Sequence, residues 1–446
     1  MPANVHRAGR LRRSYWSATT FRSSAPPKLV DAVEEALRKR PASARSPLLF
    51  TISKRLPPDL LSRLVDSFQS VNSDYEPIGC LVEDRSSTCF SVSILRWLGA
   101  SASFVAFTSN LPSRPTATVG REIWPSLIPF DALDSIKGQD PELSFSTAIG
   151  LKSGDDGIGI KVAMQNLPQE LKSLSPNSVQ SLIFFSAPSP EPLLDTLGTV
   201  FPTSGMMGLI GSSTTFETGR RSTLFRGKWI GGEQGAVGIA ILDKPTLPAV
   251  HPSITYRAMQ AFGEPMKITK AKGNIILTLN HQKATQCLLK AIAQSSELTK
   301  DVKSPILLNS QSNIHISKEK DFYLGFMDEK SRKTVDICKI TAGSLSRGAM
   351  AIGQNQRIKT DQFVQFLHSI DSQKNSEEFH SLDFPLIEFE CHEPFLTEQE
   401  KSKNPSLDEE ILVIENLFSC GSEYGFIPRH RQIVTINSAK ATLPLA

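Results

Sequence analysis

The spacing of apolar residues at the start of the chain predicts helices alternating with buried strands. Between residues 28 and 40, apolar side chains recur every three or four positions, which is typical of a helix with one buried face. The uninterrupted apolar run at 48–53 predicts a buried strand, two prolines open a second helix over 59–70, and residues 77–82 predict another strand. The region is therefore expected to form a strand, a helix and a strand.

The same order of elements recurs in residues 181–211. An apolar strand at 181–186 is followed by a helix at 191–200 and a strand at 205–211. A helix that crosses between two such strands makes them parallel, so the recurrence indicates an internal strand-helix-strand duplication in the first half of the chain. The alternative is that any α/β chain repeats this order without a duplication.

The stretch 201–242 contains the sharpest boundary between apolar and polar positions. Its strand ends at Gly211 and is followed by four serine and threonine residues, 212–215. Small residues at a strand end leave main-chain N–H groups and hydroxyls accessible, so we expect the rim of a pocket for a small polar ligand here. Residues 223–230 and 236–242 are predicted to follow as a hairpin.

A proline-rich segment at 243–252 divides the chain, because three prolines in ten residues predict a stiff connector. In the second half the pattern predicts a hairpin at 265–279, helices at 282–293 and 360–370, and a closing strand at 411–420. The fold class is accordingly α/β (α+β), with two mixed-sheet halves and flanking helices. The expected domains are 29–245 and 253–440.

The first 28 residues differ from the rest of the chain in charge. They contain six basic residues and no acidic one, the first carboxylate being Asp31, with serines, threonines and scattered apolar residues between them. This composition is typical of a mitochondrial transit peptide, so we expect 1–28 to be a presequence and the mature protein to lie in the mitochondrial matrix. The alternatives are a basic tail without structure and an arm that contacts RNA.

Composition excludes several classes of protein. Without those six basic residues the remaining 43 are balanced by 45 acidic ones, so bulk charge gives no argument for binding nucleic acid. No apolar run reaches the roughly 18–20 residues that a membrane-spanning helix needs. The six cysteines lie far apart and form no Cys-x-x-Cys pair, which argues against structural zinc and against a disulfide framework. We therefore expect no metal and no cofactor.

Two cysteines and one arginine carry candidate chemistry. Cys80 follows Gly79 and Cys420 precedes Gly421, so each thiol is predicted at a strand end. There it is a sensor of oxidants, a nucleophile, or else a buried structural thiol. Arg226 lies on a predicted strand near the expected pocket, which suits either capture of an anion or a solvated face.

Several short motifs resemble the FIST family. In the first half, LLFTIS (48–53), PIGCLVE (77–83), GLIGSSTT (208–215) and EQGAVGIAIL (233–242) resemble the N-terminal FIST domain. In the second half, MKITKAKGNIILTLNHQKATQCL (266–288), VDICKITAGSLSRGAMAIGQNQRIKTDQFVQFL (335–367) and LFSCGSEYGF (417–426) resemble the C-terminal FIST domain. The resemblance spans roughly residues 30–435 and is to a fungal-type mitochondrial member.

The resemblance implies a sensory or ligand-binding module of the kind found in signalling proteins. An F-box-bearing animal relative serves as the substrate receptor of a ubiquitin ligase, but no separate F-box precedes the first half of this sequence. The expected function is therefore binding of an unidentified small molecule or protein partner; the alternatives are a cysteine-dependent enzyme or redox sensor and a ubiquitin-ligase adaptor. The expected ligand-binding residues are Gly79, Cys80, Gly208, Gly211, Ser212, Ser213, Thr214, Arg226, Cys420 and Gly421.

Overall fold

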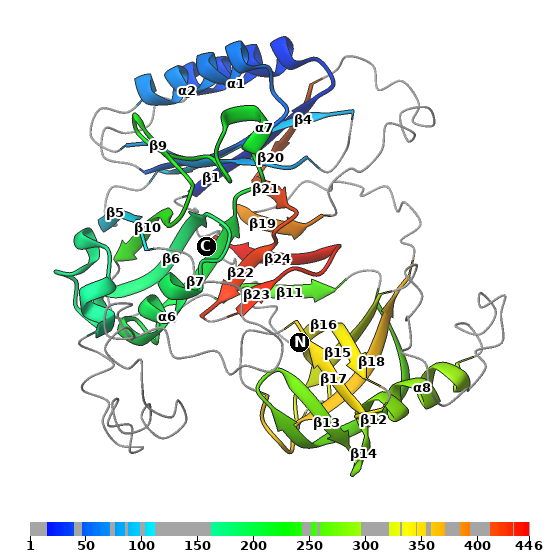
Figure 1. The fold of residues 1–446 in the computed structure, drawn as a ribbon. Coiled ribbons are helices and arrows are strands. Elements are labelled where there is room, and N and C mark those ends of the chain that lie inside the picture. Colours follow the sequence, from blue (N-terminus) through cyan, green and yellow to red (C-terminus); the bar gives the residue numbers. More distant parts are fainter. Residues whose placement is uncertain are drawn as a thin grey trace, which may run out of the picture.

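Figure 1 shows the computed structural model, which consists mainly of strands with a few helices and confirms the α+β class. The structure describes residues 16–39, 47–71, 76–84, 88–98, 103–111, 162–242, 251–256, 259–295, 321–330, 332–344, 346–353, 358–370, 384–392, 411–430 and 432–445. In this part of the chain no helix is both long and apolar enough to cross a membrane.

The first unit consists of four strands of a seven-stranded sheet, with two helices on its outer face (Figure 1). Its strands lie in the order β1 (Trp16–Ser23), β4 (Phe90–Trp97), β2 (Leu48–Ser53) and β3 (Ile78–Val82), and its helices are α1 (Pro26–Lys39) and α2 (Pro58–Val71). β2 and β3 are parallel because α2 crosses between them, whereas the other pairs are antiparallel. Leu29 and Phe68 lie in the apolar layer between the helices and the sheet.

The second unit repeats this arrangement. Its strands lie in the order β5 (Ser103–Ser109), β10 (Ala236–Leu242), β6 (Val179–Ser186) and β7 (Gly205–Ile210), and α6 (Glu191–Val200) crosses between the parallel strands β6 and β7. Two short 3-10 helices, η1 (Gln169–Leu171) and η2 (Pro176–Ser178), precede β6. The duplication that the sequence predicts is therefore confirmed.

A third copy of the sheet was not predicted. It contains β11 (Ser253–Tyr256), β24 (Ala439–Pro444), β19 (Leu386–Cys391) and β21 (Leu417–Ser422) in the same order. Again one pair, β19 and β21, is parallel and the others are antiparallel. The first strand of this copy is separated from the others by more than a hundred residues, so the pattern along the chain does not reveal the repeat.

The described residues between 259 and 369 form an antiparallel barrel. Its elements are β12 (Met259–Lys272), β13 (Ile275–Leu279), β14 (Gln282–Lys283), α8 (Ala284–Gln294), β15 (Phe322–Met327), β16 (Thr334–Ser344), β17 (Ala349–Ile352) and β18 (Phe363–Ser369). The sheet closes because β12 pairs with both β18 and β13. The predicted hairpin turn at Gly273 is confirmed, and the barrel has an apolar core of its own.

Each unit is completed by a segment that follows the corresponding strand of another unit. β8 (Leu224–Arg226), which follows β7, pairs with β3 and continues into β9 (Trp229–Gly231). β22 (Phe426–Arg429), which follows β21, pairs with β7 and continues into β23 (Gln432–Val434). Glu83, which follows β3, bridges to Gly421 of β21. The three units thus exchange partners in a cycle, which gives approximate threefold symmetry.

Two glycines occupy equivalent places in the first two units. Gly79 lies opposite Phe50, and Gly208 lies opposite Phe184. A Cβ atom on Gly79 would lie 2.5 Å from the Phe50 ring, and one on Gly208 would lie 2.6 Å from the Phe184 ring. In the third unit, Ser419 occupies this place and donates from Oγ to the Glu388 carboxylate at 3.1 Å. A polar contact has replaced the aromatic one.

Three predicted elements differ in the structure. Residues 223–242 do not form one hairpin, because the chain turns at Gly227 (φ 55°), leaving β8 and β9 in the first sheet while β10 enters the second. Residues 360–370 contain a strand, β18, instead of a helix. The predicted strand at 411–420 is broken at Asn416 (φ 61°) into β20 (Leu412–Glu415), which pairs with β1, and β21.

Part of the predicted presequence belongs to the folded molecule. Residues 16–28 include β1, whose Trp16 and Phe21 side chains are buried, and the start of α1. Residues 1–15 lie outside the described residues.

Candidate functional site

A cavity of about 300 Å³ lies at the carboxyl end of β6 and β7, where the second unit faces the barrel. The carboxyl ends of parallel strands are where α/β sheets bind ligands. Three parts of the chain form its wall: the second unit, strand β16 of the barrel, and the segment around β22 and β23. The lining residues are Pro188, Ser189, Pro190, Glu191, Ile210, Arg221, Asp336, Ile337, Cys338, Lys339, Gly353, Tyr424, Gln432, Ile433, Thr435 and Ile436.

The connection between β6 and α6 brings the amino end of a helix to this cavity. Ser189 has a φ of 65°, and the prolines on either side of it restrict the chain to this turn. α6 then begins, with the Leu194 N–H donating to the Pro190 carbonyl at 3.0 Å. The partial positive charge of the helix amino end is therefore directed toward the cavity.

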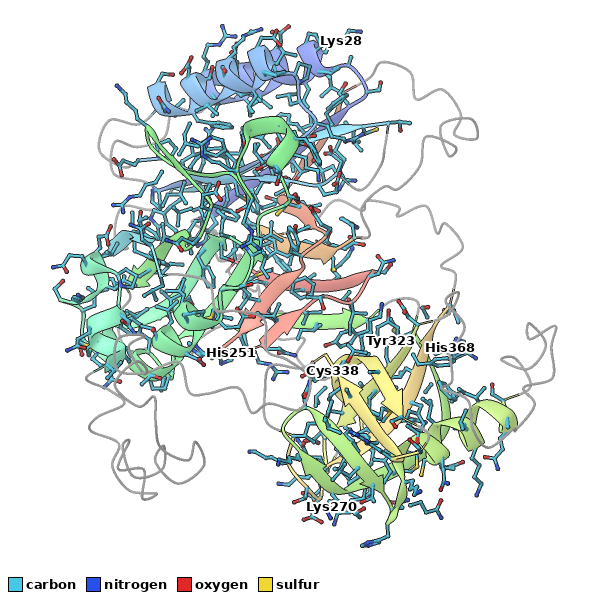
Figure 2. All side chains as sticks on the ribbon, viewed as in Figure 1. Lys28, His251, Lys270, Tyr323, Cys338 and His368 are labelled. Atoms are coloured by element: carbon cyan, nitrogen blue, oxygen red, sulfur yellow. The ribbon has the colours of Figure 1, made fainter. Side chains whose placement is uncertain are left out.

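Asp336 is a partly buried acid in the barrel wall. Its Oδ1 accepts hydrogen bonds from Gln432 Nε2 and from the Ile337 N–H, both at 2.9 Å. Burial raises the pKa of Asp336, although the bonds from Gln432 and Ile337 oppose this shift. Arg429 donates to Gln432 Oε1 and to the Val335 carbonyl, so hydrogen bonds hold β16 against β22 and β23. Figure 2 shows Cys338, two residues further along β16, on the barrel side nearest the other sheets.

Of the residues that the structure describes, four with charged side chains line the cavity. Lys339 pairs with Asp321 at 2.5 Å, Asp336 is bonded as described above, and Glu191 has partners of its own. The guanidinium of Arg221, by contrast, makes no ion pair or hydrogen bond within the part of the chain that the structure describes. Arg221 is exposed and therefore available to a ligand.

A second polar group lies beside the cavity, where the strand ends of the three units meet. Lys54, directly after β2, pairs with Glu83 at 2.6 Å and with Glu423 at 3.5 Å. Glu423 also accepts a hydrogen bond from the Ser213 N–H at 2.7 Å. Glu83, Ser212 and Glu423 are equivalent positions, each four residues after the glycine or serine that lies opposite Phe50, Phe184 or Glu388.

The charge of Lys54 stabilises the contact between the first and third units. Only 12% of its side chain is exposed. Burial alone would lower the pKa of Lys54, but its hydrogen bond to Glu83 and the charge of Glu423 outweigh burial and raise that pKa. Lys54 is therefore an ammonium at neutral pH, and it ties the first unit to the third.

Four predicted binding residues lie in the core and do not line the cavity. Gly79 and Gly208 lie within strands beneath phenylalanine rings. Cys80 and Cys420 are 0% and 4% exposed in the central core. Burial, and then the neighbouring Cys420, raise the pKa of Cys80 well above its ordinary value. Both thiols are shielded from solvent, and the Cys80 thiol stays protonated.

The predicted rim lies beside the cavity, and its polar groups are largely used by the fold. The Gly211 N–H donates to the Ser186 carbonyl at 2.8 Å, and the Ser212 N–H donates to the Leu81 carbonyl at 3.2 Å. The Thr214 hydroxyl shares a hydrogen bond with the Thr223 hydroxyl at 2.7 Å. Gly421 is covered by the His392 ring, which lies 2.1 Å from where a Cβ would be.

Arg226 is held by other parts of the protein. Its Nε donates to Glu76 at 2.9 Å, and its Nη1 donates to the Thr108 hydroxyl at 2.8 Å and to Glu170. The side chain therefore joins β8 to β5 and η1, and it does not line the cavity.

Sequence reasoning missed the residues that complete the cavity. Asp336 and Gln432 lie almost a hundred residues apart, one in the barrel and one after the third parallel pair. One signal was present: an acid inside the apolar strand VDICKI is costly to bury without a partner, so it points to a hydrogen bond from elsewhere.

Comparison with protein families identifies one domain. The search of curated proteins returned no match. A FIST N domain, a type of domain that generally senses small ligands, is found at residues 133–282, about a third of the chain. This domain contains the cavity residues of the β6–α6 connection together with Ile210 and Arg221.

Proposed function

We propose that this protein is a ligand-binding sensory protein whose FIST N domain takes a small molecule in the cavity at the end of β6 and β7. The observation that carries this proposal is the position of the cavity, at the carboxyl end of a parallel strand pair and at the amino end of the helix between them. Its volume of about 300 Å³ is at the lower end of the range for small-molecule sites.

The far wall of the cavity suits a sensor. Asp336 and Lys339 belong to the barrel, whereas Ile210 and Arg221 belong to the second unit. A ligand that contacts both walls stabilises the arrangement in which the barrel faces the second unit, so ligand binding changes how often the barrel adopts this position. A protein partner that binds only this arrangement would then respond to the ligand.

Native mass spectrometry of the full chain, purified without denaturation, tests the site. We expect an additional small-molecule mass in the wild type that is lost in Thr435→Trp, because this exposed side chain lines the cavity and a larger one narrows it. Thr255→Trp, on an exposed position of β11 outside the cavity, is the control and should keep the mass. A mass that persists in Thr435→Trp, or a wild type that neither carries a ligand nor is stabilised by any member of a metabolite library, would reject the proposal.

We further infer that the protein acts in the mitochondrion, because its first 15 residues contain four arginines and no acid. β1 begins at Trp16, which is buried, so in this proposal the presequence ends before Trp16. The prediction is that residues 1–15 direct a fluorescent protein to mitochondria and that the chain without residues 2–15 is no longer imported. Mitochondrial fluorescence that survives this deletion would contradict the inference.

A further inference from the structure

We propose that the ligand of this cavity carries an anionic group, a carboxylate or a phosphate, and that Arg221 binds it. This inference rests on the proposed function and adds the chemical class of the ligand. It follows from the state of each charged side chain around the cavity.

The carboxylates of the wall are already engaged. Asp336 accepts hydrogen bonds from Gln432 and from the main chain of Ile337, and Glu191 has partners within the protein. These contacts compensate part of the negative charge of both acids. Lys339 is likewise paired, with Asp321. Among the described charged side chains of the wall, the guanidinium of Arg221 is left for a ligand, and its planar donors match a carboxylate or phosphate.

Neighbouring basic residues show that this availability is specific to Arg221. Arg226 is occupied by Glu76, Glu170 and Thr108. Arg220 lies outside the cavity, and its Nη1 donates to the Thr218 carbonyl at 3.4 Å. Adjacent residues with the same charge therefore have different surroundings, so Arg220 serves as a matched control for Arg221.

Other donors lie around the same space. The amino end of α6 also lies at the wall, where Glu191 of its first turn already compensates part of its positive partial charge. Ser189, Tyr424 and Thr435 also line the cavity, and each brings a hydroxyl. Ile210 and Ile433 give the wall an apolar part, so the ligand should combine its anionic group with a small apolar body.

Matched aromatic probes test the sign of the ligand charge. Benzoate, phenyl phosphate, benzamide and benzylamine share a ring and differ in the attached group, so ligand-observed NMR with the full-length protein compares their affinities directly. We expect benzoate or phenyl phosphate to bind more tightly than benzamide, and benzylamine to bind most weakly. The preferred anion distinguishes a carboxylate ligand from a phosphate ligand.

Variants then locate the interaction. Arg221→Gln should weaken anion binding about tenfold to a hundredfold and leave benzamide unchanged, because a charge-assisted bidentate contact is lost. Arg221→Lys should be intermediate, since a lysine keeps the charge without the planar fork. Arg220→Gln should bind like the wild type. Thermal unfolding of each variant controls for folding, and Arg221 is exposed, so no loss of stability is expected.

The outcomes separate this inference from the proposed function. If benzamide or benzylamine binds as tightly as benzoate and Thr435→Trp abolishes that binding, the cavity is a ligand site but the inference about the anion is wrong. Anion binding that is unchanged in Arg221→Gln also overturns the inference. If no probe binds and the native protein carries no additional mass, the proposed function and the inference both fail.

Discussion

Gly79 and Gly208 are required by the aromatic rings that lie on them. Phe50 and Phe184 are 1% and 0% exposed, and Phe50 also stacks on Phe68 with the ring centroids 4.4 Å apart. These rings have no free space to move into. A side chain at either glycine would therefore displace a well-packed part of the core.

We predict that Gly79→Ala and Gly208→Ala each lower the free energy of unfolding by about 1–3 kcal/mol, which is typical of overpacking. Unfolding in urea measures the loss. Gly343→Ala is the matched control, because its Cβ would lie at an ordinary 3.4 Å from a methyl group of Thr285. If the two core variants are as stable as this control, the packing argument is wrong.

The buried cysteines should be unreactive in the folded protein. Cys80, Cys287, Cys338, Cys391 and Cys420 are buried, and only Cys89 is partly exposed. Burial raises the pKa of Cys80 and of Cys338 well above the ordinary value, which keeps the nucleophilic thiolate scarce.

We predict that iodoacetamide at pH 8 modifies Cys89 first and that Cys80 and Cys420 react only after unfolding. Peptide mass spectrometry of samples taken over time measures each site. Rapid modification of Cys80 or Cys420 in the native protein would instead favour the cysteine-dependent enzyme or redox sensor.

At the level of single residues, the sequence identified small residues whose purpose it could not specify. A glycine permits a close approach, but the approaching group, a ligand or a phenylalanine ring, lies elsewhere in the chain. Gly79 and Gly208 illustrate this limit. Arg221 illustrates another, because Arg220, Arg221 and Arg226 carry the same charge in the sequence and only the structure shows which of them are paired.

At the scale of elements, prediction succeeded for uninterrupted apolar strands and for helices with one buried face, and it failed at β18, whose apolar run is interrupted by polar residues. The first helices and the two strand-helix-strand units follow simple apolar patterns, and their bounds agree with the structure within a few residues. β18 has Val364 and Phe366 in the barrel core and Leu367 in the central core. Burial on both sides removes the alternation of a strand, and its apolar spacing then resembles that of a helix.

Lys54 joins two units, so its charge should matter for stability. Lys54→Met leaves Glu83 buried without its cation, and breaking a buried pair in this way costs roughly 3–5 kcal/mol. Chemical denaturation measures this loss. Lys39→Met removes an exposed pair with Glu35 and should leave the free energy of unfolding nearly unchanged. Equal effects of the two substitutions would show that Lys54 is not a structural link.

The ion pair of Lys54 with Glu83 should make the stability of the protein depend on pH in the alkaline range. Because the pKa of Lys54 is raised in the folded state, its contribution is complete below the ordinary lysine value of 10.5 and is lost as the pH rises through the higher folded value. We therefore predict that the stability difference between wild type and Lys54→Met shrinks above about pH 10.5. A difference that stays constant to pH 12 would contradict this assignment.

At the scale of the whole molecule, the cyclic exchange of strands makes the three units interdependent. β20 completes the first sheet and β22 completes the second, although both come from the last part of the chain. Such pairings between distant segments leave no trace in the local pattern, which explains why the sequence predicted two halves and the structure contains three units and a barrel. The domains expected at 29–245 and 253–440 remain a prediction, and strands from both ranges share sheets.

The barrel, in contrast, should be separable. Met259 and Ser369 are cross-strand partners, so the insertion leaves and re-enters the threefold body at one place. We predict that residues 259–370 alone unfold in one cooperative thermal transition. A chain in which a short Gly-Ser linker replaces them should keep the three-unit body but lose ligand binding, because Asp336 and Lys339 are absent from it.

A chain that ends at residue 370 retains the barrel but lacks β19 to β24, so its remaining units should not fold. Calorimetry and amide NMR spectra of the three shortened proteins measure these outcomes. An unfolded isolated barrel, or folded units in the chain that ends at 370, would show that stability is distributed in some other way than the strand exchange implies.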